Sequence, residues 1–238
     1  MTHLLGIRRF PVKAMAGEPL DRAEVDARGL VGDRAWAVVD ADGKLATGKH
    51  GRRFRRFDAI FDFGAATGAD GVVRVVRHRG GDGDAVPREA GDPGLDAELA
   101  SALEAPVRLL PEDGVAAPGD WFDSGAVSLV GSATAAWAER ELGAGAAVRR
   151  LRANLVVETA EPFEEETWLG RRLRIGEAEL IVEQRIARCR MVDLAQDGVP
   201  APAPLLKALG ATRDAKLAVY CRPTRAGALA VGNAVALV

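Results

Sequence analysis

Cys189 is the first residue of this sequence that could do chemistry. It lies in Arg-Ile-Ala-Arg-Cys-Arg-Met (185–191), where three arginines stand within four residues of one thiol. Positive charge favours the thiolate, which is the form that binds metals and attacks electrophiles. The alternative is that the side chain packs as a small apolar group, as lone cysteines often do. The segment therefore makes Cys189 a candidate soft metal ligand or nucleophile.

Two predicted strands carry polar side chains at every second position. Arg152 and Asn154 share one face of the first strand. Tyr220 and Arg222 share one face of the second, while Cys221 points to the opposite, core face. Guanidinium, amide and phenol groups suit a ligand with phosphate and many other hydrogen-bonding groups, and the alternative is a solvated strand face. A core position for Cys221 leaves the other cysteine as the candidate thiolate.

Hydroxyl and cationic groups elsewhere could add contacts to an anion. Ser132 and Thr134 stand at the predicted start of a helix, where either could cap the helix and where backbone N–H groups bind anions. Lys13 and Arg34 lie beside short predicted strands and could bind phosphate. An ordinary helix cap and ordinary surface charges are the alternatives. These four side chains complete the candidate anion-binding set.

The elements that must position these residues are mostly short strands. Many short strands with few helices are typical of a β-rich α+β protein with barrel-like sheets and peripheral helices. Turn signals such as Asp-Ala-Asp-Gly (40–43) separate the strands. We predict helices at 95–104, 135–142 and 203–209, and strands at 4–10, 34–39, 72–77, 126–130, 151–158, 172–175, 178–184, 216–222 and 228–237.

A change in composition predicts two domains. Residues 79–94 are rich in Gly, Asp and Pro, which predicts a mobile surface loop or linker. We place a small barrel-like domain at 1–95 and a larger β-barrel domain with peripheral helices at 96–238. A ligand bound by residues of both would lie in the cleft between them, as ligands often do.

Composition excludes several classes of protein. The 238 residues are 48% hydrophobic and 28% charged, which is typical of a soluble globular protein. A net charge of −2 gives no general attraction to nucleic acid or to anionic membranes, and no apolar stretch approaches the ~20 residues that span a bilayer. Three scattered histidines and the lack of Cys-x-x-Cys give no support for a zinc or iron–sulfur site.

The two cysteines and the first residues bear on the compartment. Two cysteines in different contexts do not suggest a disulfide framework. The start of the sequence has no secretory leader, so we expect a cytoplasmic protein.

Several motifs together resemble a known family. Pro-Val-Lys-Ala-Met-Ala-Gly-Glu-Pro-Leu (11–20) and Arg-Gly-Leu-Val-Gly-Asp-Arg-Ala-Trp-Ala-Val-Val-Asp (28–40) resemble the N-terminal β-barrel domain that precedes MOSC domains. Resemblance to the MOSC domain itself lies in five further segments, 151–157, 161–163, 168–170, 173–177 and 188–189. This domain is named after the C-terminal domain of molybdenum cofactor sulfurase. The resemblance implies a MOSC β-barrel, similar to the pyruvate kinase β-barrel, behind a smaller N-terminal β-barrel domain.

The resemblance also implies a cofactor and its ligands. Family members of the amidoxime-reducing type bind molybdopterin, and a cysteine thiolate completes the coordination of molybdenum. Cys189 stands at that position. The other matching positions would hold the pterin and its phosphate: Lys13, Arg34, Ser132, Thr134, Arg152, Asn154, Tyr220 and Arg222. Departures from the family pattern at Ala14, Gly48 and Ala153 bear on substrate choice more than on cofactor binding.

The function implied is that of a molybdenum-dependent oxidoreductase that reduces small N-hydroxylated compounds. The sequence ends at Val238 without a ferredoxin-like module, so we expect a separate electron donor of ferredoxin, flavodoxin or cytochrome type. The alternative is a non-redox protein, in which Cys189 carries sulfur as a persulfide or the protein binds and delivers the cofactor. A purely structural β-domain is a third interpretation, which leaves the polar strand faces unexplained.

Overall fold

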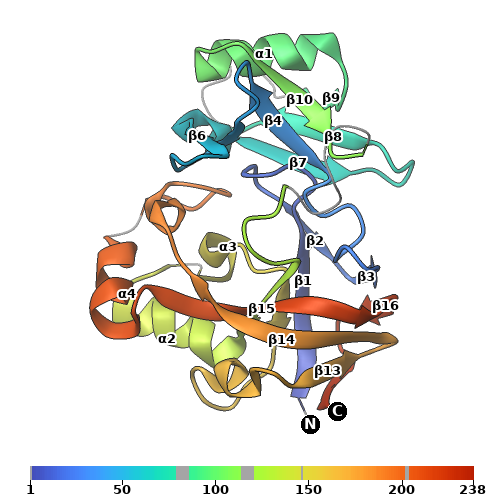
Figure 1. Cartoon of the computed structure of the whole chain (residues 1–238), viewed down its shortest axis with the longest axis vertical. Helices are drawn as coiled ribbons and strands as arrows, with labels where there is room; N and C mark the ends of the chain where they lie inside the picture. Colours follow the sequence, from blue (N-terminus) through green and yellow to red (C-terminus); the bar gives the residue numbers. More distant parts are fainter. Residues whose placement is uncertain (1, 79–85, 114–120, 146, 202–203) are drawn as a thin grey trace.

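A computed structural model describes residues 2–78, 86–113, 121–145, 147–201 and 204–238. Strands dominate, as the sequence predicted, and helices lie at the periphery (Figure 1). Of the Gly- and Asp-rich segment 79–94 predicted as a loop, residues 79–85 lie outside the described residues, and the rest contains a short strand at Arg88–Glu89 and the start of a helix at Pro93. Among the described helices, none is long and apolar enough to cross a membrane.

The largest sheet closes on itself as a barrel of seven strands. In order around the barrel the strands are β1 (Thr2–Arg9), β12 (Leu155–Val157), β11 (Val127–Gly131), β15 (Lys216–Arg225), β14 (Ala178–Ala187), β13 (Arg172–Ile175) and β17 (Ala234–Leu237). The pairing of β1 with β12 closes the barrel, and all neighbouring strands are antiparallel except β11 and β12, which are parallel. The alternating apolar side chains of these strands fill the barrel, among them Leu4, Leu129, Leu155, Leu180, Val219 and Cys221.

Two smaller sheets lie above the barrel in Figure 1. The first has the order β10 (Val107–Pro111), β4 (Trp36–Asp40), β5 (Leu45–Thr47) and β6 (Phe54–Arg56), and the second has the order β7 (Phe63–Thr67), β8 (Val73–Arg77) and β9 (Arg88–Glu89). Short strands link this region to the barrel: β2 (Glu18–Leu20), which pairs with β1, and β3 (Arg22–Val25), which pairs with β16 (Gly227–Ala230).

Helix α1 (Pro93–Leu103) covers these upper sheets. Asp92 caps it by accepting a hydrogen bond from the Gly94 N–H at 2.7 Å, and Pro93 fills the first position, where no N–H is needed. Leucines four residues apart, Leu95 and Leu99, then share the face that packs into the upper core. The helix ends at Glu104, whose φ of 51° is left-handed.

The other helices pack against the barrel: α2 (Ser132–Leu142), α3 (Ala147–Leu151) and α4 (Leu205–Arg213). Single 3₁₀ turns lie at Asp58–Asp62 (η1), Glu164–Trp168 (η2) and Arg190–Asp193 (η3). The apolar side chains between α2, α3, α4 and β15 form a core of their own outside the barrel.

The strands predicted at 178–184 and 216–222 both run three residues farther than expected. Two other strand predictions were wrong in more than their length. The strand expected at 151–158 begins only at Leu155, because α3 continues to Leu151 and the next residue, Arg152, has a left-handed φ of 53°. The single closing strand expected at 228–237 is two strands, β16 and β17, because the chain turns at Gly232 with a φ of 88°.

The sheets do not follow the sequence boundary at residue 95. Strand β1, from the first 95 residues, closes the barrel, and β10, from the later part, extends the upper sheet beside β4. The domain division at 1–95 and 96–238 stays a prediction.

Candidate functional site

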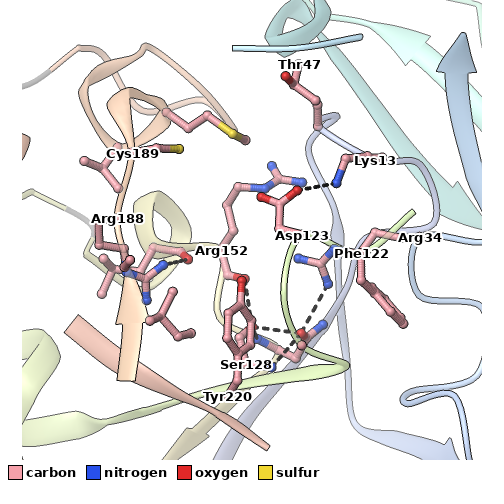
Figure 2. Close-up of a pocket in the computed structure, with 18 of the residues that line it drawn as sticks. Lys13, Arg34, Thr47, Phe122, Asp123, Ser128, Arg152, Arg188, Cys189 and Tyr220 are labelled. Atoms are coloured by element: carbon pink, nitrogen blue, oxygen red, sulfur yellow. Dashed lines mark hydrogen bonds and ion pairs between the residues drawn. The ribbon is translucent and has the colours of Figure 1, made fainter. Parts of the chain in front are cut away.

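A pocket lies where the barrel meets the upper sheets. Its volume is about 760 Å³ when the open space beside it is counted. Chain segments far apart in sequence meet here (Figure 2). The polar side chains that line it are Lys13, Arg34, Thr47, Asp123, Ser128, Arg150, Arg152, Asn154, Arg188, Cys189 and Tyr220.

Cys189 lies on one side of this pocket, directly after β14 and at the start of η3. Its thiol is partly exposed, whereas Cys221 is fully buried in the barrel core, as the sequence predicted. Burial raises the pKa of Cys221 far above its ordinary value. Of the two thiols, only Cys189 is placed to meet a ligand.

The arginines that flank Cys189 in sequence bind elsewhere. Arg188 donates to the carbonyl oxygens of Leu217 and Leu151 at 2.7–2.9 Å. Burial lowers its pKa to about 10, and the nearby Tyr220 and Cys189 oppose that decrease. Arg190 turns outward to Asp58, 2.6 Å away, and Arg185 pairs with Glu166 on the other side of β14. Arg188 is thus the flanking cation closest in charge to the thiol, and three of its N–H donors already bind carbonyl oxygens.

Arg152 crosses the pocket between Cys189 and Lys13 (Figure 2). Its guanidinium lies 4.3 Å above the ring centroid of the buried Phe10, and Nη2 donates to the Met15 carbonyl at 2.8 Å. The other terminal nitrogen, Nη1, is buried without a hydrogen-bond partner. Burial lowers the pKa of Arg152 to about 9, and the neighbouring Arg34 lowers it further. A buried donor left unpaired costs about 1–3 kcal/mol, so Nη1 is a vacant position for an acceptor.

Arg34 and Asn154 form a second polar group against the same ring. Arg34 stacks 4.8 Å from the Phe10 centroid and donates to Asn154 Oδ1 at 3.2 Å. Ser128 donates to the same oxygen through its hydroxyl at 2.8 Å and its backbone N–H at 3.1 Å. Asn154 Nδ2 in turn donates to the Arg8 carbonyl at 3.1 Å. This network fixes the position of Asn154 at the pocket floor.

Lys13 forms the opposite wall together with Asp123. Its ammonium donates to Asp123 Oδ1 and to the Trp121 carbonyl, both at 2.7 Å. Burial lowers the pKa of Lys13 to about 8 despite the nearby carboxylate. Burial opposes ionisation of Asp123 as well, but Lys13 and Lys49 hold its pKa below its usual range.

Backbone strain gathers at this pocket. Ala14, Arg34 and Arg152 all line it, and all have left-handed φ values of 69°, 49° and 53°. Such conformations cost about 1–3 kcal/mol each for residues with a side chain. They persist because the surrounding contacts fix these residues, and strain of this kind is common where a ligand binds.

Two family models match the chain along nearly all of its length. The model of the MOSC N-terminal beta barrel domain matches residues 1–89, and the model of the MOSC domain matches residues 94–236. The chain belongs to the MOSC domain family. The resemblance of the sequence motifs is thereby confirmed, and the family is associated with binding of the molybdenum cofactor.

One solved structure shows the same fold at low sequence identity, and two others align over about half of the chain. The YuaD protein from Bacillus subtilis aligns over 99% of this chain and 94% of its own, with 15% identity and a TM-score of 0.53. YiiM from Geobacillus stearothermophilus aligns over 48% of this chain and 54% of its own, with 21% identity and a TM-score of 0.38. YiiM from Escherichia coli covers the same shares, with 17% identity and a TM-score of 0.37. None of the curated proteins matches this MOSC protein.

Six of the nine side chains predicted for the site line the pocket of this MOSC protein: Lys13, Arg34, Arg152, Asn154, Cys189 and Tyr220. Tyr220 pairs in register with Ser128 on β11, and burial raises its pKa. Arg222 lies farther along β15 and ion-pairs with Glu183 at 2.6 Å on the exposed surface. It stays outside the pocket, because two residues along a strand shift a side chain by about 7 Å.

Ser132 and Thr134 also lie outside the pocket. Gly131, which has no side chain, is the N-cap of α2, so the predicted cap by Ser132 or Thr134 is wrong. The hydroxyl of Thr159, from another segment, accepts from the Ala133 N–H in the first turn at 3.1 Å. Ser132 instead accepts from the Thr159 N–H at 3.1 Å, and Thr134 donates to the buried Glu165 at 2.8 Å. Both hydroxyls therefore join the turn around η2 to the helix.

Sequence reasoning missed several lining residues. Ser128 lies in an otherwise apolar strand, and a polar residue in such a strand was the only sign in the sequence that it belongs to a site. Phe122 and Asp123 follow no periodic pattern, so nothing in their sequence marked them. Arg150, 2% exposed, donates to four carbonyls and supports the loop around Pro200.

The donor set of this pocket fits a molybdopterin. Phosphate and pterin need several N–H donors, and the vacant Nη1 of Arg152 lies beside Arg34 and Asn154. Molybdenum accepts thiolate ligands, and Cys189 offers a partly exposed thiol in the same cavity. The described part of the chain has no cluster of three His, Cys, Asp or Glu side chains that could hold a metal ion, so Cys189 would be a single protein ligand.

Proposed function

We propose that this MOSC protein is a molybdenum-dependent oxidoreductase that reduces small N-hydroxylated compounds. In this proposal Cys189 is the protein ligand of molybdenum. Electrons come from a separate donor protein of ferredoxin, flavodoxin or cytochrome type, and the protein acts in the cytoplasm.

One observation carries the proposal. The thiol that can bind a soft metal and the guanidinium with a vacant donor, on Arg152, line one cavity, although 36 residues of sequence separate them. Cationic groups that surround a cavity concentrate anions in it.

Each side chain has a part that follows from its position. Arg152, Arg34 and Lys13 would bind the phosphate and the anionic edge of the pterin, because they carry the cationic donors of the cavity. Asn154 and Tyr220 would orient the ring system from the floor, where Ser128 holds the amide in place. The cofactor, when bound, supplies two-electron oxygen-atom chemistry, while the protein supplies binding, orientation and electrostatics.

A persulfide carrier or a cofactor-delivery protein is the second candidate. The partial exposure of Cys189 and the charge of Arg188 beside it support this candidate too. Both features suit a persulfide anion as well as they suit a thiolate bound to a metal. Such a protein would not turn over N-hydroxylated substrates.

The test is the content of molybdenum and pterin in protein made by a host that synthesises the cofactor. We expect near-stoichiometric metal by elemental analysis and pterin by fluorescence. Cys189→Ala should lose the metal and keep the pterin, because the cationic side chains remain. Cys221→Ala is the matched control and should keep both, since this thiol lies in the barrel core.

Other outcomes are equally informative. Unchanged molybdenum in Cys189→Ala would remove this residue from the metal site. Neither metal nor pterin in the unaltered protein would favour the persulfide carrier. A protein that holds metal and pterin, but reduces no amidoxime or hydroxylamine when a chemical reductant supplies the electrons, would favour the delivery protein.

A further inference from the structure

A short segment, residues 121–125, precedes β11, and three of its residues, Phe122, Asp123 and Gly125, line the pocket. We call it the strap. Long side chains bind its carbonyl oxygens: Arg53 donates to Phe122 at 3.2 Å, and Gln184 donates to Ser124 at 3.2 Å. Trp121 and Phe122 are buried and anchor the start of the strap, whereas Ser124 is exposed. Asp123 thus lies in the strap between two buried residues, Trp121 and Phe122, and the exposed Ser124.

Asp123 is clasped by two lysines. Lys13 Nζ lies 2.7 Å from Oδ1, and Lys49 Nζ lies 3.0 Å from Oδ2. The side chains of Asp123 and Lys49 are 30% and 24% exposed, while Lys13 is 7% exposed. The ring of Phe54 supports both ammonium groups at 5.2 and 4.3 Å from its centroid.

This carboxylate is the exception in a cationic cavity. Among the described residues that line the pocket, five are Lys or Arg, and Asp123 is the sole carboxylate. Its two oxygens accept charge-assisted hydrogen bonds from ammonium groups, as the oxygens of a phosphate do. The two lysines therefore form an anion-binding site, and the anion bound there is the carboxylate of Asp123 from the same chain.

We propose that Lys13, which lines the pocket, and Lys49, which reaches the pocket-lining Asp123 from outside the lining, form a phosphate subsite. In this proposal Asp123 occupies the subsite in the ligand-free protein, and an incoming phosphate group displaces Asp123. The proposal rests on the proposed function only in that the phosphate enters the same pocket. Lys49 becomes a ligand-binding residue, and Asp123 sets how tightly phosphate is held.

Displacement requires little movement. Asp123 is partly exposed, so its side chain can turn into solvent while Trp121 and Phe122 stay packed. A released carboxylate regains water as hydrogen-bond partner, and the two lysines keep an anion between them. The competition weakens phosphate binding but keeps the two lysines from repelling each other in its absence.

The experiment is calorimetric titration of the purified protein with inorganic phosphate at low salt. Asp123→Asn keeps the shape of the side chain but removes the competing charge, so we expect phosphate to bind about tenfold more tightly, a coupling of ordinary size. Lys49→Gln should bind about tenfold more weakly. Asp70→Asn, which breaks an ion pair with Arg74 outside the pocket, is the matched control and should bind as the unaltered protein does.

The outcomes separate the two roles of Asp123. Equal or weaker phosphate binding by a folded Asp123→Asn variant would show that the carboxylate only holds the lysines in place, and it would overturn the proposal. If that variant does not fold, Lys49→Gln decides, because undiminished phosphate binding there also overturns the proposal.

Pterin-loaded protein identifies the source of the phosphate. Phosphate that binds only to pterin-free protein assigns the subsite to the phosphate of the cofactor. Phosphate that still binds to the loaded protein assigns it to a phosphorylated substrate. The titration of pterin-free protein needs no metal or pterin, so its result is independent of the molybdenum measurement that tests the proposed function.

Discussion

At the scale of residues, Arg152 shows how a side chain is prepared for a ligand. The ring of Phe10 and the Met15 carbonyl hold its guanidinium, and one nitrogen is left without a partner. Burying this charge is costly, and the chain itself does not supply all the hydrogen bonds that the guanidinium can make. A ligand acceptor at Nη1 would complete it.

Arg152→Ala should therefore lose pterin while the fold remains. We expect the pterin content after gel filtration to fall at least about tenfold, because one charge-assisted hydrogen bond contributes about 1.5–3 kcal/mol. Arg174→Ala, at an exposed position of β13, is the control and should retain pterin. Normal pterin content in Arg152→Ala would contradict its role in holding the phosphate and the pterin.

Lys13 predicts a pH dependence of anion binding. Burial, with smaller contributions from Arg34 and Lys49, lowers its pKa to about 8, against the opposing effect of Asp123. The ammonium is charged below that pH and neutral above it, so anion binding should weaken as the pH rises through about 8. Titration with sulfate, whose charge is constant over this range, measures the effect. Lys13→Arg should keep binding at higher pH, and an equal decline in that variant would assign the effect to another group.

At the scale of elements, the strap depends on a glycine that lies against Tyr220. A Cβ on Gly125 would come within 2.5 Å of Tyr220 Cγ and 2.7 Å of its Cβ. Either the strap or the β15 residue would have to shift. The position of the strap beside the pocket is therefore set by close packing as well as by its hydrogen bonds.

Gly125→Ala should lower the free energy of unfolding by about 1–3 kcal/mol, the usual cost of overpacking. Gly210→Ala is a control of opposite sign, because Gly210 lies within α4 and a Cβ there meets nothing within 4 Å. It should raise the free energy of unfolding by about 0.5–1 kcal/mol. Urea unfolding of both variants measures the difference, and equal stability of the two would contradict the close packing at Tyr220.

At the scale of the whole molecule, the barrel is completed by its first strand. Strand β1 pairs with β12 on one side and with β17 on the other, so both edges of the seam depend on it. Without β1 the barrel would expose two strand edges and part of its apolar interior.

We expect residues 96–238 alone not to fold cooperatively, although they hold six of the seven barrel strands. Circular dichroism and thermal unfolding of the fragment measure this. Co-expression with residues 1–95 should restore a folded complex, which shows that the missing part is β1 and the sheets that follow it. Cooperative unfolding of the isolated fragment would contradict the need for β1.

The sequence by itself determined the class of fold and the family. Short β-branched runs with turns between them predicted most of the strands, and the spacing of the motifs predicted the MOSC fold, because both signals are local in the chain. Residue type made Cys189, Arg152 and Lys13 candidates for the site, and the resemblance to the family gave each of them a position in it. The same local rules placed Cys221 correctly in the core.

Only the tertiary structure decided which of these side chains meet. Arg152 and Asn154 reach the pocket from a left-handed turn and not from a strand face, because α3 packs against the barrel immediately before them. Alternation along β15 placed Tyr220 and Arg222 on one face, but only Tyr220 lines the pocket. The lysine pair around Asp123 joins residues 74 and 110 positions apart, a contact that no local pattern encodes.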